Sequence, residues 1–291
     1  MEIYDDLLNN YDAKLLAGGA AQNSARGAQY ILPADSVVFF GCVGKDKYAD
    51  TLQKANKEAG LHAEYRYDTE KPTGRCGVVI TGHNRSMCTD LAAANEYKVD
   101  HLKQEWDYVK NASVYFVGGF HLTVSVPAVM ALAEEAANSK SDKIFMLSLS
   151  APFIPQFFKD QVDQTAPYWD YVVGNESEAM AYADSHDLKT HDIPTIAKHM
   201  ANLPKQNTRR KRTVIITQGT EPTVVAIQDQ DKVKEYPIHA INKEQITDTI
   251  GAGDAFAGGF LAGIVQGKDL DTCVDMGSWL ARLGIQELGA S

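Results

Sequence analysis

The chain has 291 residues, 44% of them hydrophobic, and a formal net charge of −10. This length suits one large domain, or one domain with a small insertion, and the acidity argues against a nucleic-acid or anionic-membrane partner. The four cysteines are scattered and no apolar run reaches membrane-spanning length, which favours a cytoplasmic protein.

Short β-rich runs alternate with helical runs along the chain. Because both faces of the expected strands are apolar, this alternation predicts a mostly parallel sheet covered by helices. Ligands of such sheets bind beyond the carboxyl ends of the strands. The expected helices are 20–31, 47–59, 126–137, 176–184, 193–201 and 253–266, and the expected strands are 37–40, 114–117, 144–149, 171–173, 214–217 and 223–227.

Residues 62–90 break this alternation, because they contain extended runs and no helical run. Turn signals at residues 71–74 and 82–84 separate the runs. We therefore expect a small antiparallel β insertion at 62–90, able to act as a lid over a site. Residues 1–61 and 91–291 then form the large domain.

A first Gly-rich turn, Gly18-Gly19, opens the expected helix 20–31. A tight turn without a ligand is one interpretation, and a place where backbone approaches a polar ligand is the other. Asn23 follows in the same helix. Its side chain could bond ligand hydroxyls or cap the helix.

A second Gly-rich turn, Gly251-Ala252-Gly253, opens the expected helix 253–266 and is followed by Asp254. The first turn of a helix has unpaired N–H groups and partial positive charge, so this turn is a candidate cradle for an anion. Asp254 would then be a base beside the cradle. Tight packing of small residues is the alternative, since the spacing matches neither a Walker loop nor a dinucleotide fingerprint.

Asn175 and Glu178 follow the expected strand 171–173. Their spacing is typical of a capping box at a helix start. The alternative is a site for hydrated Mg²⁺, which keeps most of its waters and takes few carboxylates.

Three isolated features have less specific patterns. Arg85 in the expected lid is either a surface residue or a clamp on a transferring phosphate. Cys76 is expected to be a small packing residue rather than a nucleophile. The basic run at 209–212 is expected to be a solvated loop, with nuclear import or anion binding as the alternative.

Eight segments together resemble the ribokinase/phosphofructokinase-B carbohydrate kinase family, and within it the eukaryotic branch that acts on adenosine. They are AGGAAQNSARGAQ, FFGCVGKDKY, PTGRCGVVITGHNRSM, DLAAANEY, LSAPFI, VGNESEA, ITQG and DTIGAGDAFAGGF. The resemblance covers nearly the whole chain. It implies a three-layer α/β/α ribokinase-like domain with a small β lid. It also implies a monomer, cytoplasmic and also nuclear, that uses ATP and Mg²⁺ to phosphorylate the 5′-hydroxyl of adenosine.

The resemblance also implies roles for individual residues. Asp254 matches the catalytic base, the turn from Gly251 through Ala252 to Gly253 matches the anion hole, and Arg85 matches a lid arginine near the phosphates. The remaining matches are Gly18, Gly19 and Asn23 for the ribose; Cys76, Met87, Leu91, Phe120 and Phe153 for the walls around adenine; Asn175 and Glu178 for the water of Mg²⁺; and Thr217 and Gly219 for ATP.

The chain departs from the family pattern in three places. Ile250 stands where the family usually has Asn, and a β-branched residue tolerates left-handed backbone poorly, so we expect a distorted anion hole. We also expect the family's first core strand, whose Asp binds the ribose hydroxyls, and part of the lid to be absent before Ala17. We expect the usual tail after Ser291 to be absent as well. A truncated or non-catalytic nucleoside-binding homologue, and a kinase for another nucleoside or sugar, are the alternative functions.

Overall fold

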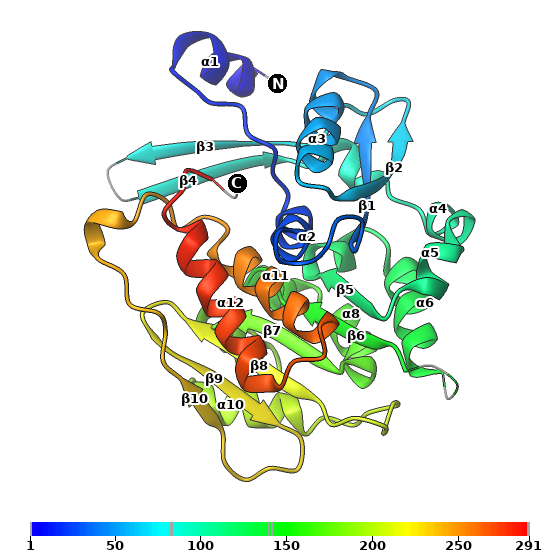
Figure 1. Ribbon diagram of the computed structural model, residues 1–291, viewed down its shortest axis with the longest axis vertical. Coiled ribbons are helices and arrows are strands. Elements are labelled where there is room, and N and C mark those ends of the chain that lie inside the picture. Colours follow the sequence, from blue (N-terminus) through cyan, green and yellow to red (C-terminus); the bar gives the residue numbers. More distant parts are fainter. Residues whose placement is uncertain (1, 82–83, 139, 141, 290–291) are drawn as a thin grey trace.

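The computed structural model describes residues 2–81, 84–138, 140 and 142–289, without the side chains of residues 2, 84 and 85. Its central sheet has the strand order β10-β9-β8-β7-β6-β5 (Figure 1). The four strands from β5 to β8 are parallel, as expected, whereas β9 pairs antiparallel with β8 and β10 pairs antiparallel with β9. The strands are β5 (Val114–Gly118), β6 (Ile144–Ser148), β7 (Tyr171–Asn175), β8 (Thr213–Gln218), β9 (Glu221–Ile227) and β10 (Lys234–Tyr236).

Helices cover both faces of this sheet, which makes the three-layer α/β/α arrangement. Figure 1 shows α2, α11 and α12 side by side over one face. These three are α2 (Ala20–Ile31), α11 (Ala252–Val265) and α12 (Leu270–Gly284). On the other face lie α6 (Val126–Ala137), α7 (Phe153–Phe157), α8 (Lys159–Thr165), α9 (Glu176–Ser185) and α10 (Ile193–Ala201). Short 3-10 turns are η2 (Gly119–Thr123), η3 (Ala166–Tyr168) and η4 (Lys243–Gln245).

Two small sheets lie outside the central one. The strands β1 (Val38–Gly44) and β2 (His62–Asp68) are parallel and are joined through α3 (Lys47–Glu58). The strands β3 (Arg75–Thr81) and β4 (Asn84–Asp90) form an antiparallel hairpin. The expectation of antiparallel pairing across 62–90 is therefore wrong for β2, because a helical crossover before it allows parallel pairing with β1.

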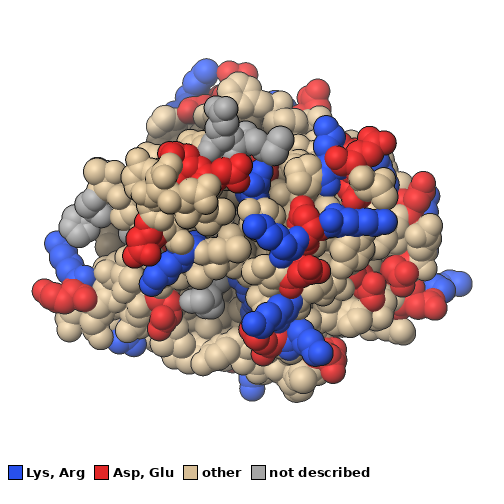
Figure 2. Space-filling view, turned by 90° about the horizontal axis from the view of Figure 1, so that it is seen from above, with Lys and Arg blue, Asp and Glu red and all other residues tan. Residues whose placement is uncertain are grey.

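The helix α1 (Glu2–Asn10) covers one face of the β3–β4 hairpin. The Tyr4 hydroxyl donates a hydrogen bond to the Cys88 carbonyl at 3.2 Å, and the Arg75 guanidinium lies 4.7 Å from the Tyr4 ring centroid. The hairpin is followed by η1 (Ala92–Glu96), α4 (Val99–Gln104) and α5 (Trp106–Asn111). Seen from above, Lys and Arg are interspersed with Asp and Glu (Figure 2). None of the described helices has the length and apolar character needed to cross a membrane.

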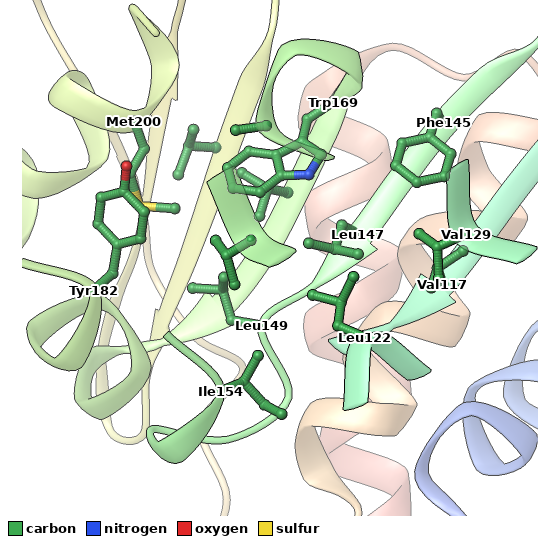
Figure 3. Close-up of a cluster of buried hydrophobic side chains, with 14 of the residues drawn as sticks. Val117, Leu122, Val129, Phe145, Leu147, Leu149, Ile154, Trp169, Tyr182 and Met200 are labelled. Carbon is green, nitrogen blue, oxygen red and sulfur yellow. The ribbon is translucent and has the colours of Figure 1, made fainter. Parts of the chain in front are cut away.

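Two large hydrophobic clusters lie one on each side of the central sheet, and a third, smaller cluster lies between α3 and the β1–β2 sheet. Strand side chains alternate between the two large clusters, so Phe145 and Leu147 join the cluster under α6, α8, α9 and α10, whereas Met146 joins the cluster under α2, α11 and α12. Figure 3 shows the first cluster, with Leu147 beside the fully buried Trp169. Each such apolar side chain contributes about 1.5–3 kcal/mol by leaving water.

The small residues of α11 allow its backbone to approach both neighbouring helices. A Cβ added at Gly258 would lie 2.7 Å from the Ser24 carbonyl oxygen of α2. One added at Gly259 would lie 2.4 Å from the Met276 carbonyl oxygen of α12. Glycine is therefore required at both positions, and α2, α11 and α12 pack backbone to backbone.

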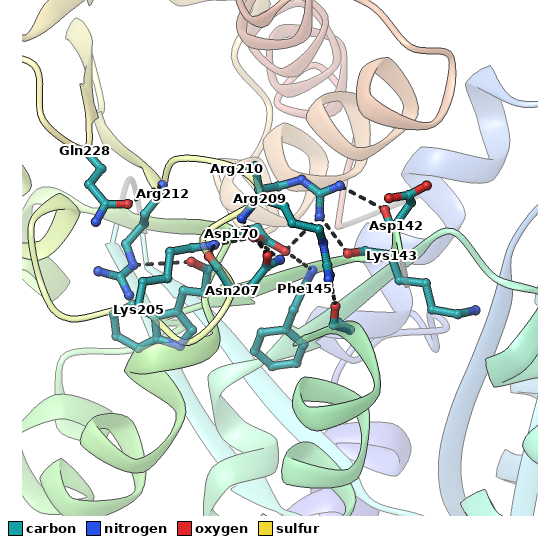
Figure 4. Close-up of polar contacts among 12 residues, drawn as sticks. Asp142, Lys143, Phe145, Asp170, Lys205, Asn207, Arg209, Arg210, Arg212 and Gln228 are labelled. Atoms are coloured by element: carbon teal, nitrogen blue, oxygen red, sulfur yellow. Dashed lines mark hydrogen bonds and ion pairs between the residues drawn. The ribbon is translucent and has the colours of Figure 1, made fainter. Parts of the chain in front are cut away.

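Part of the basic run at 209–212 is structural, so the expectation of a solvated loop is wrong for Arg210 and Arg212, whereas Lys211 is exposed. Arg212 is fully buried, and its guanidinium donates to six backbone carbonyls, those of Ala166, Trp169, Met200, Ala201, Leu203 and Pro204. The buried Asp170 carboxylate accepts from Arg210 at 3.3 Å and from Lys205 at 2.6 Å (Figure 4). Loop carbonyls that water cannot reach need donors from inside the protein, and these basic side chains provide them.

Candidate active site

The turn before α11 brings backbone N–H groups and a carboxylate to one place. Gly251 is the N-cap residue, with φ of 83° and ψ of 0°, which is left-handed backbone. The Ala255 N–H donates to the Gly251 carbonyl at 2.8 Å, so the helix begins directly after the turn. The Ala252 N–H donates to the Thr249 carbonyl at 3.3 Å. The other early N–H groups of the first turn have no carbonyl four residues before them within the helix, which leaves them available to an anion.

Ile250 does not take the left-handed conformation in this turn, because that conformation falls on Gly251. The Ile250 N–H donates to the Asp248 carboxylate at 3.0 Å. The same carboxylate accepts from the Gly289 N–H at 3.1 Å and is buried. The physical reason for expecting a distorted anion hole is therefore removed.

Asp254 lies in the first turn of α11 and faces α2. The Asn23 side-chain amide donates to Asp254 Oδ2 at 2.9 Å. Burial raises the pKa of the Asp254 carboxyl to about 6, against the opposing effects of the Asn23 hydrogen bond and the Arg26 charge. At neutral pH the carboxylate is mostly ionised, yet it is a much better proton acceptor than an exposed aspartate.

Asn23 is inside α2, so the interpretation that it caps the helix is wrong. The N-cap residue is Gly19, which has φ of 107° and makes no side-chain cap. The Asn23 N–H donates to the Gly19 carbonyl at 2.8 Å. Gly18 and Gly19 are exposed, so this turn is open to a ligand.

Asn175 and Glu178 form the capping box that their spacing predicts. The Asn175 side chain accepts from the Glu178 N–H at 2.9 Å, and the Asn175 N–H donates to Glu178 Oε2 at 3.0 Å. Burial raises the pKa of the Glu178 carboxyl to about 7, and the charges of Glu176 and Asp254 add to this rise. The site therefore contains two carboxyl groups with raised pKa values, those of Asp254 and Glu178, and the negative charge of Asp254 disfavours ionisation of Glu178.

The pair of Asn175 and Glu178 suits a hydrated cation better than a directly ligated one. Glu178 Oε1 accepts from the Asn175 amide at 2.9 Å and Oε2 accepts from its backbone N–H, and each oxygen keeps a further lone pair for water. Within the described ranges, no group of three or more His, Cys, Asp or Glu could hold a metal. Mg²⁺ commonly keeps several waters and few carboxylates, and this donor set fits that habit.

Two phenylalanines form an apolar face at the carboxyl ends of β5 and β6. Phe120 lies in η2 after β5, and Phe153 starts α7 after β6. Their ring centroids are 5.9 Å apart and tilted, and Phe153 is 41% exposed. Gly118 lies between α2 and β6, since a Cβ there would meet Ala21 at 3.5 Å and Ser150 at 3.7 Å. This face is suited to the flat surface of an aromatic ligand.

The hairpin residues are placed on its uncovered face. Cys76 and Met87 share this face by strand register, and α1 packs on the opposite one, where a Cβ on Gly77 would meet Leu7 at 2.9 Å. Met87 is 65% exposed and Leu91 is 41% exposed, so these side chains do not close on the phenylalanines. Cys76 Sγ accepts from the Thr89 hydroxyl at 3.2 Å. The Arg85 side chain lies outside the described residues.

Thr217 and Gly219 lie at the same edge of the sheet as Asn175. Thr217 pairs with Asn175 between β8 and β7. Gly219 has φ of 56°, is exposed, and lies in the turn to β9. Loops after β5, β6, β7 and β8 therefore all contribute to this edge, together with the starts of α2 and α11.

Arg26 is a residue of this site that the sequence analysis did not select. Its guanidinium donates to Asn23 Oδ1 at 2.8 Å and to the Ala17 carbonyl at 3.1 Å. The available signal was its position three residues after Asn23 on an expected helix, which places both on one helix face.

Comparison with known proteins gives consistent matches along the whole chain. The model of the pfkB family carbohydrate kinase matches residues 2–291. The chain is 47% identical over 293 residues to adenosine kinase of Saccharomyces cerevisiae, covering 100% of this chain and 84% of that protein. It is 46% identical to adenosine kinase of Schizosaccharomyces pombe, with 100% and 84% covered.

Solved structures show the same likeness. Anopheles gambiae adenosine kinase in complex with P1,P4-di(adenosine-5) tetraphosphate superposes with a TM-score of 0.96 at 43% identity, covering 99% of this chain and 85% of that one. Adenosine kinase from Schistosoma mansoni in complex with 2-fluoroadenosine superposes with a TM-score of 0.95 at 32% identity, covering 100% and 86%.

Proposed function

The chain belongs to the pfkB family of carbohydrate kinases, and we propose that it transfers the terminal phosphoryl group of ATP to the 5′-hydroxyl of adenosine, giving AMP and ADP. The observation that carries this proposal is Asp254, which is partly buried, oriented by Asn23, and next to the Gly251 turn. The two yeast relatives that match the full length of this chain are adenosine kinases, and the two solved adenosine kinases described above are complexes with adenosine-based ligands.

Asp254 is the general base in this proposal. Its carboxylate accepts the proton of the 5′-hydroxyl as that oxygen bonds to the transferred phosphorus and the bond to ADP breaks. A carboxyl of pKa about 6 is too weak to form an alkoxide in advance, but it can accept the proton late in a loose transition state.

The N–H groups around Gly251, Ala252 and Gly253 are the proposed anion hole. They lie at the positive end of α11 and beside the base, where negative charge develops on the phosphoryl oxygens. Loss of one such donor typically lowers kcat by about 10²–10³. The Arg85 guanidinium is proposed as a further donor from the hairpin.

The substrate is proposed to bind between the α2 turn and the phenylalanine face. The ribose would be contacted by Gly18, Gly19 and Asn23. The adenine ring would stack near Phe120 and Phe153. The apolar hairpin face would close over adenine with Cys76, Met87 and Leu91, which makes the β3–β4 hairpin the proposed lid. Its exposed apolar residues support this, since exposed apolar surface often marks a binding site.

Asn175 and Glu178 would hold the waters of Mg²⁺, and Thr217 and Gly219 would contact ATP at the adjoining strand end. When bound, Mg²⁺ neutralises phosphate charge. The chain's own contribution is the orientation of the Glu178 carboxylate by two hydrogen bonds from Asn175.

We expect a monomer in the cytoplasm, and also in the nucleus, with no nucleic-acid or membrane partner. The net charge of −10 supports the expectation of no nucleic-acid or membrane partner, because binding to phosphate backbones or anionic lipid favours a basic field.

A substrate panel tests the proposal. AMP formation from adenosine with Mg·ATP is compared with phosphorylation of inosine, guanosine, ribose and fructose, alongside Asp254→Asn and a matched surface control, Asp231→Asn. We expect strong preference for adenosine, lost in Asp254→Asn and kept in Asp231→Asn. Preference for another substrate would identify a different kinase of the family. Adenosine binding by calorimetry without turnover would identify a nucleoside-binding protein.

A further inference from the structure

We infer that Arg26 is a positioning residue, which holds the Asn23 amide in the orientation that donates to Asp254. This inference rests on the proposed kinase function and extends it, because it assigns a role to a side chain outside the residues that contact the reacting atoms.

The hydrogen-bond chain has a single possible direction. Arg26 Nη2 lies 2.8 Å from Asn23 Oδ1, and Asn23 Nδ2 lies 2.9 Å from Asp254 Oδ2. A guanidinium only donates and a carboxylate only accepts, whereas an amide has one end of each kind. The amide therefore faces Arg26 with its oxygen and Asp254 with its nitrogen, and a flipped amide would lose both bonds.

The fixed amide in turn fixes the catalytic carboxylate. With Oδ2 held by Asn23, rotation of the Asp254 carboxylate is restricted, and Oδ1 is the oxygen left to take the proton of the substrate hydroxyl. Proton transfer needs donor and acceptor within hydrogen-bond reach, so a rotated carboxylate would lower kcat more than it weakens substrate binding.

Arg26 also connects this carboxylate to the start of α2. The same Nη2 donates to the Ala17 carbonyl, directly before the Gly18–Gly19 turn that is proposed to hold the ribose. One guanidinium thus contacts both the segment before the turn proposed to hold the ribose and, through Asn23, the Asp254 carboxylate.

The charges around Asp254 support the assignment. Arg26 on α2 lowers the pKa of the Asp254 carboxyl, while the negative charge of Asp254 helps to raise the pKa of Glu178 on α9. Tyr65 on β2 also interacts electrostatically with Arg26 and raises the pKa of its guanidinium. Arg26 is partly buried and its own pKa is lowered by burial, so solvent screens its interaction with the carboxylate less than at an exposed site.

A purely structural role for Arg26, tethering the segment before α2, predicts different kinetics. Such a role would change stability, while the folded enzyme would keep its kcat. A role through Asn23 makes the two residues act as a unit, so their effects on kcat do not multiply.

The kinetic test compares Arg26→Met, Arg26→Lys, Asn23→Ala and the Arg26→Met/Asn23→Ala double variant. Ser24→Ala is the matched control, since its buried hydroxyl bonds only to the Ala20 carbonyl of its own helix in the described contacts. We expect Arg26→Met to lower kcat about 10-fold, with the KM for ATP unchanged, and Arg26→Lys to recover most of it. The double variant should be no slower than Asn23→Ala. Multiplying effects, or an unchanged kcat in folded Arg26→Met, would overturn the inference.

A second readout needs no turnover. With ¹⁵N-labelled asparagine, the Asn23 side-chain signal is identified by its loss in Asn23→Ala. We expect this signal to shift in Arg26→Met, to shift less in Arg26→Lys, and to stay in place in Ser24→Ala. Should Arg26→Met not fold, the neutral Arg26→Gln takes its place in both tests. An Asn23 side-chain signal with the same chemical shift in Arg26→Met as in the wild type would refute the inference. Wild-type protein that leaves adenosine unphosphorylated refutes the proposed function instead, and the NMR result still decides the role of Arg26.

Discussion

Replacing Asp254 with asparagine should make the protein more stable at neutral pH and nearly inactive. The asparagine keeps the shape of the side chain and an oxygen for the Asn23 amide, but it removes a partly buried charge. As the proposed base, Asp254 contributes about 10²–10⁴ to kcat, and that factor should be lost. Burial raises the pKa of its carboxyl from 3.8 to about 6, so ionising this group costs the folded state more than the unfolded state.

The size of the stability gain follows from this pKa difference. Two pH units at 1.36 kcal/mol each give a limit of about 3 kcal/mol. A carboxyl group whose pKa is raised in the folded state stabilises that state fully below pH 3.8. This stabilisation is lost as the pH rises through about 6. Relative to that of Asp254→Asn, the free energy of unfolding of the wild type should therefore fall by about 1 kcal/mol by pH 4.5 and by about 3 kcal/mol by pH 7.5.

The assay is urea unfolding of both proteins, without ligands, at several pH values between 4.5 and 7.5. Only the pH dependence of the difference matters, because effects of the amide itself are independent of pH. The exposed Asp231→Asn variant controls for general loss of charge and should stay within about 0.5 kcal/mol of the wild type at every pH. A difference that is flat with pH would refute the buried-charge reasoning. Retention of more than about a tenth of kcat would refute the role as base.

Three further outcomes are expected. Glu178→Gln should raise the Mg²⁺ concentration needed for half-maximal rate, or lower the rate, by about 10–100-fold, and an unchanged Mg²⁺ titration would leave Glu178 as a helix cap alone. Arg212→Met should lower the free energy of unfolding by about 3–5 kcal/mol without changing kcat of the folded enzyme, whereas the exposed Lys211→Met should do neither. Ile250→Asn should change kcat less than about threefold, because Gly251 carries the left-handed backbone; a large gain would mean that Ile250 impairs the turn.

Elements with local signals were predictable from the sequence. The expected helix 126–137 coincides with α6, and the expected helix 20–31 coincides with α2, because the apolar spacing and the turn residues that define them are neighbours in the chain. The start of α11 was predictable for the same reason, since a Gly-Ala-Gly turn and the following helix lie in one short segment.

Features that depend on distant partners were not predictable. The parallel partner of β2 is set by the crossover through α3, and the extended run itself has no signal for pairing direction. Arg212 is buried because carbonyls between residues 166 and 204 converge on it, which no basic run reveals. In the site, Asn23 and Asp254 were both selected, but their hydrogen bond joins residues 231 positions apart. A sequence pattern suggests such residues one by one, and only the fold brings them into contact.

The close packing of α11 has a consequence for motion during turnover. With Gly258 against the α2 backbone and Gly259 against α12, the helix that bears Asp254 and the helix that bears Asn23 cannot slide past one another. Opening and closing are therefore left to parts attached more loosely, such as the β3–β4 hairpin, while the base and its amide travel as a rigid pair. A Gly258→Ala substitution lies away from the proposed ligand contacts, yet it should push α2 and α11 apart. The hydrogen bond between Asn23 and Asp254 would then weaken, and kcat should fall.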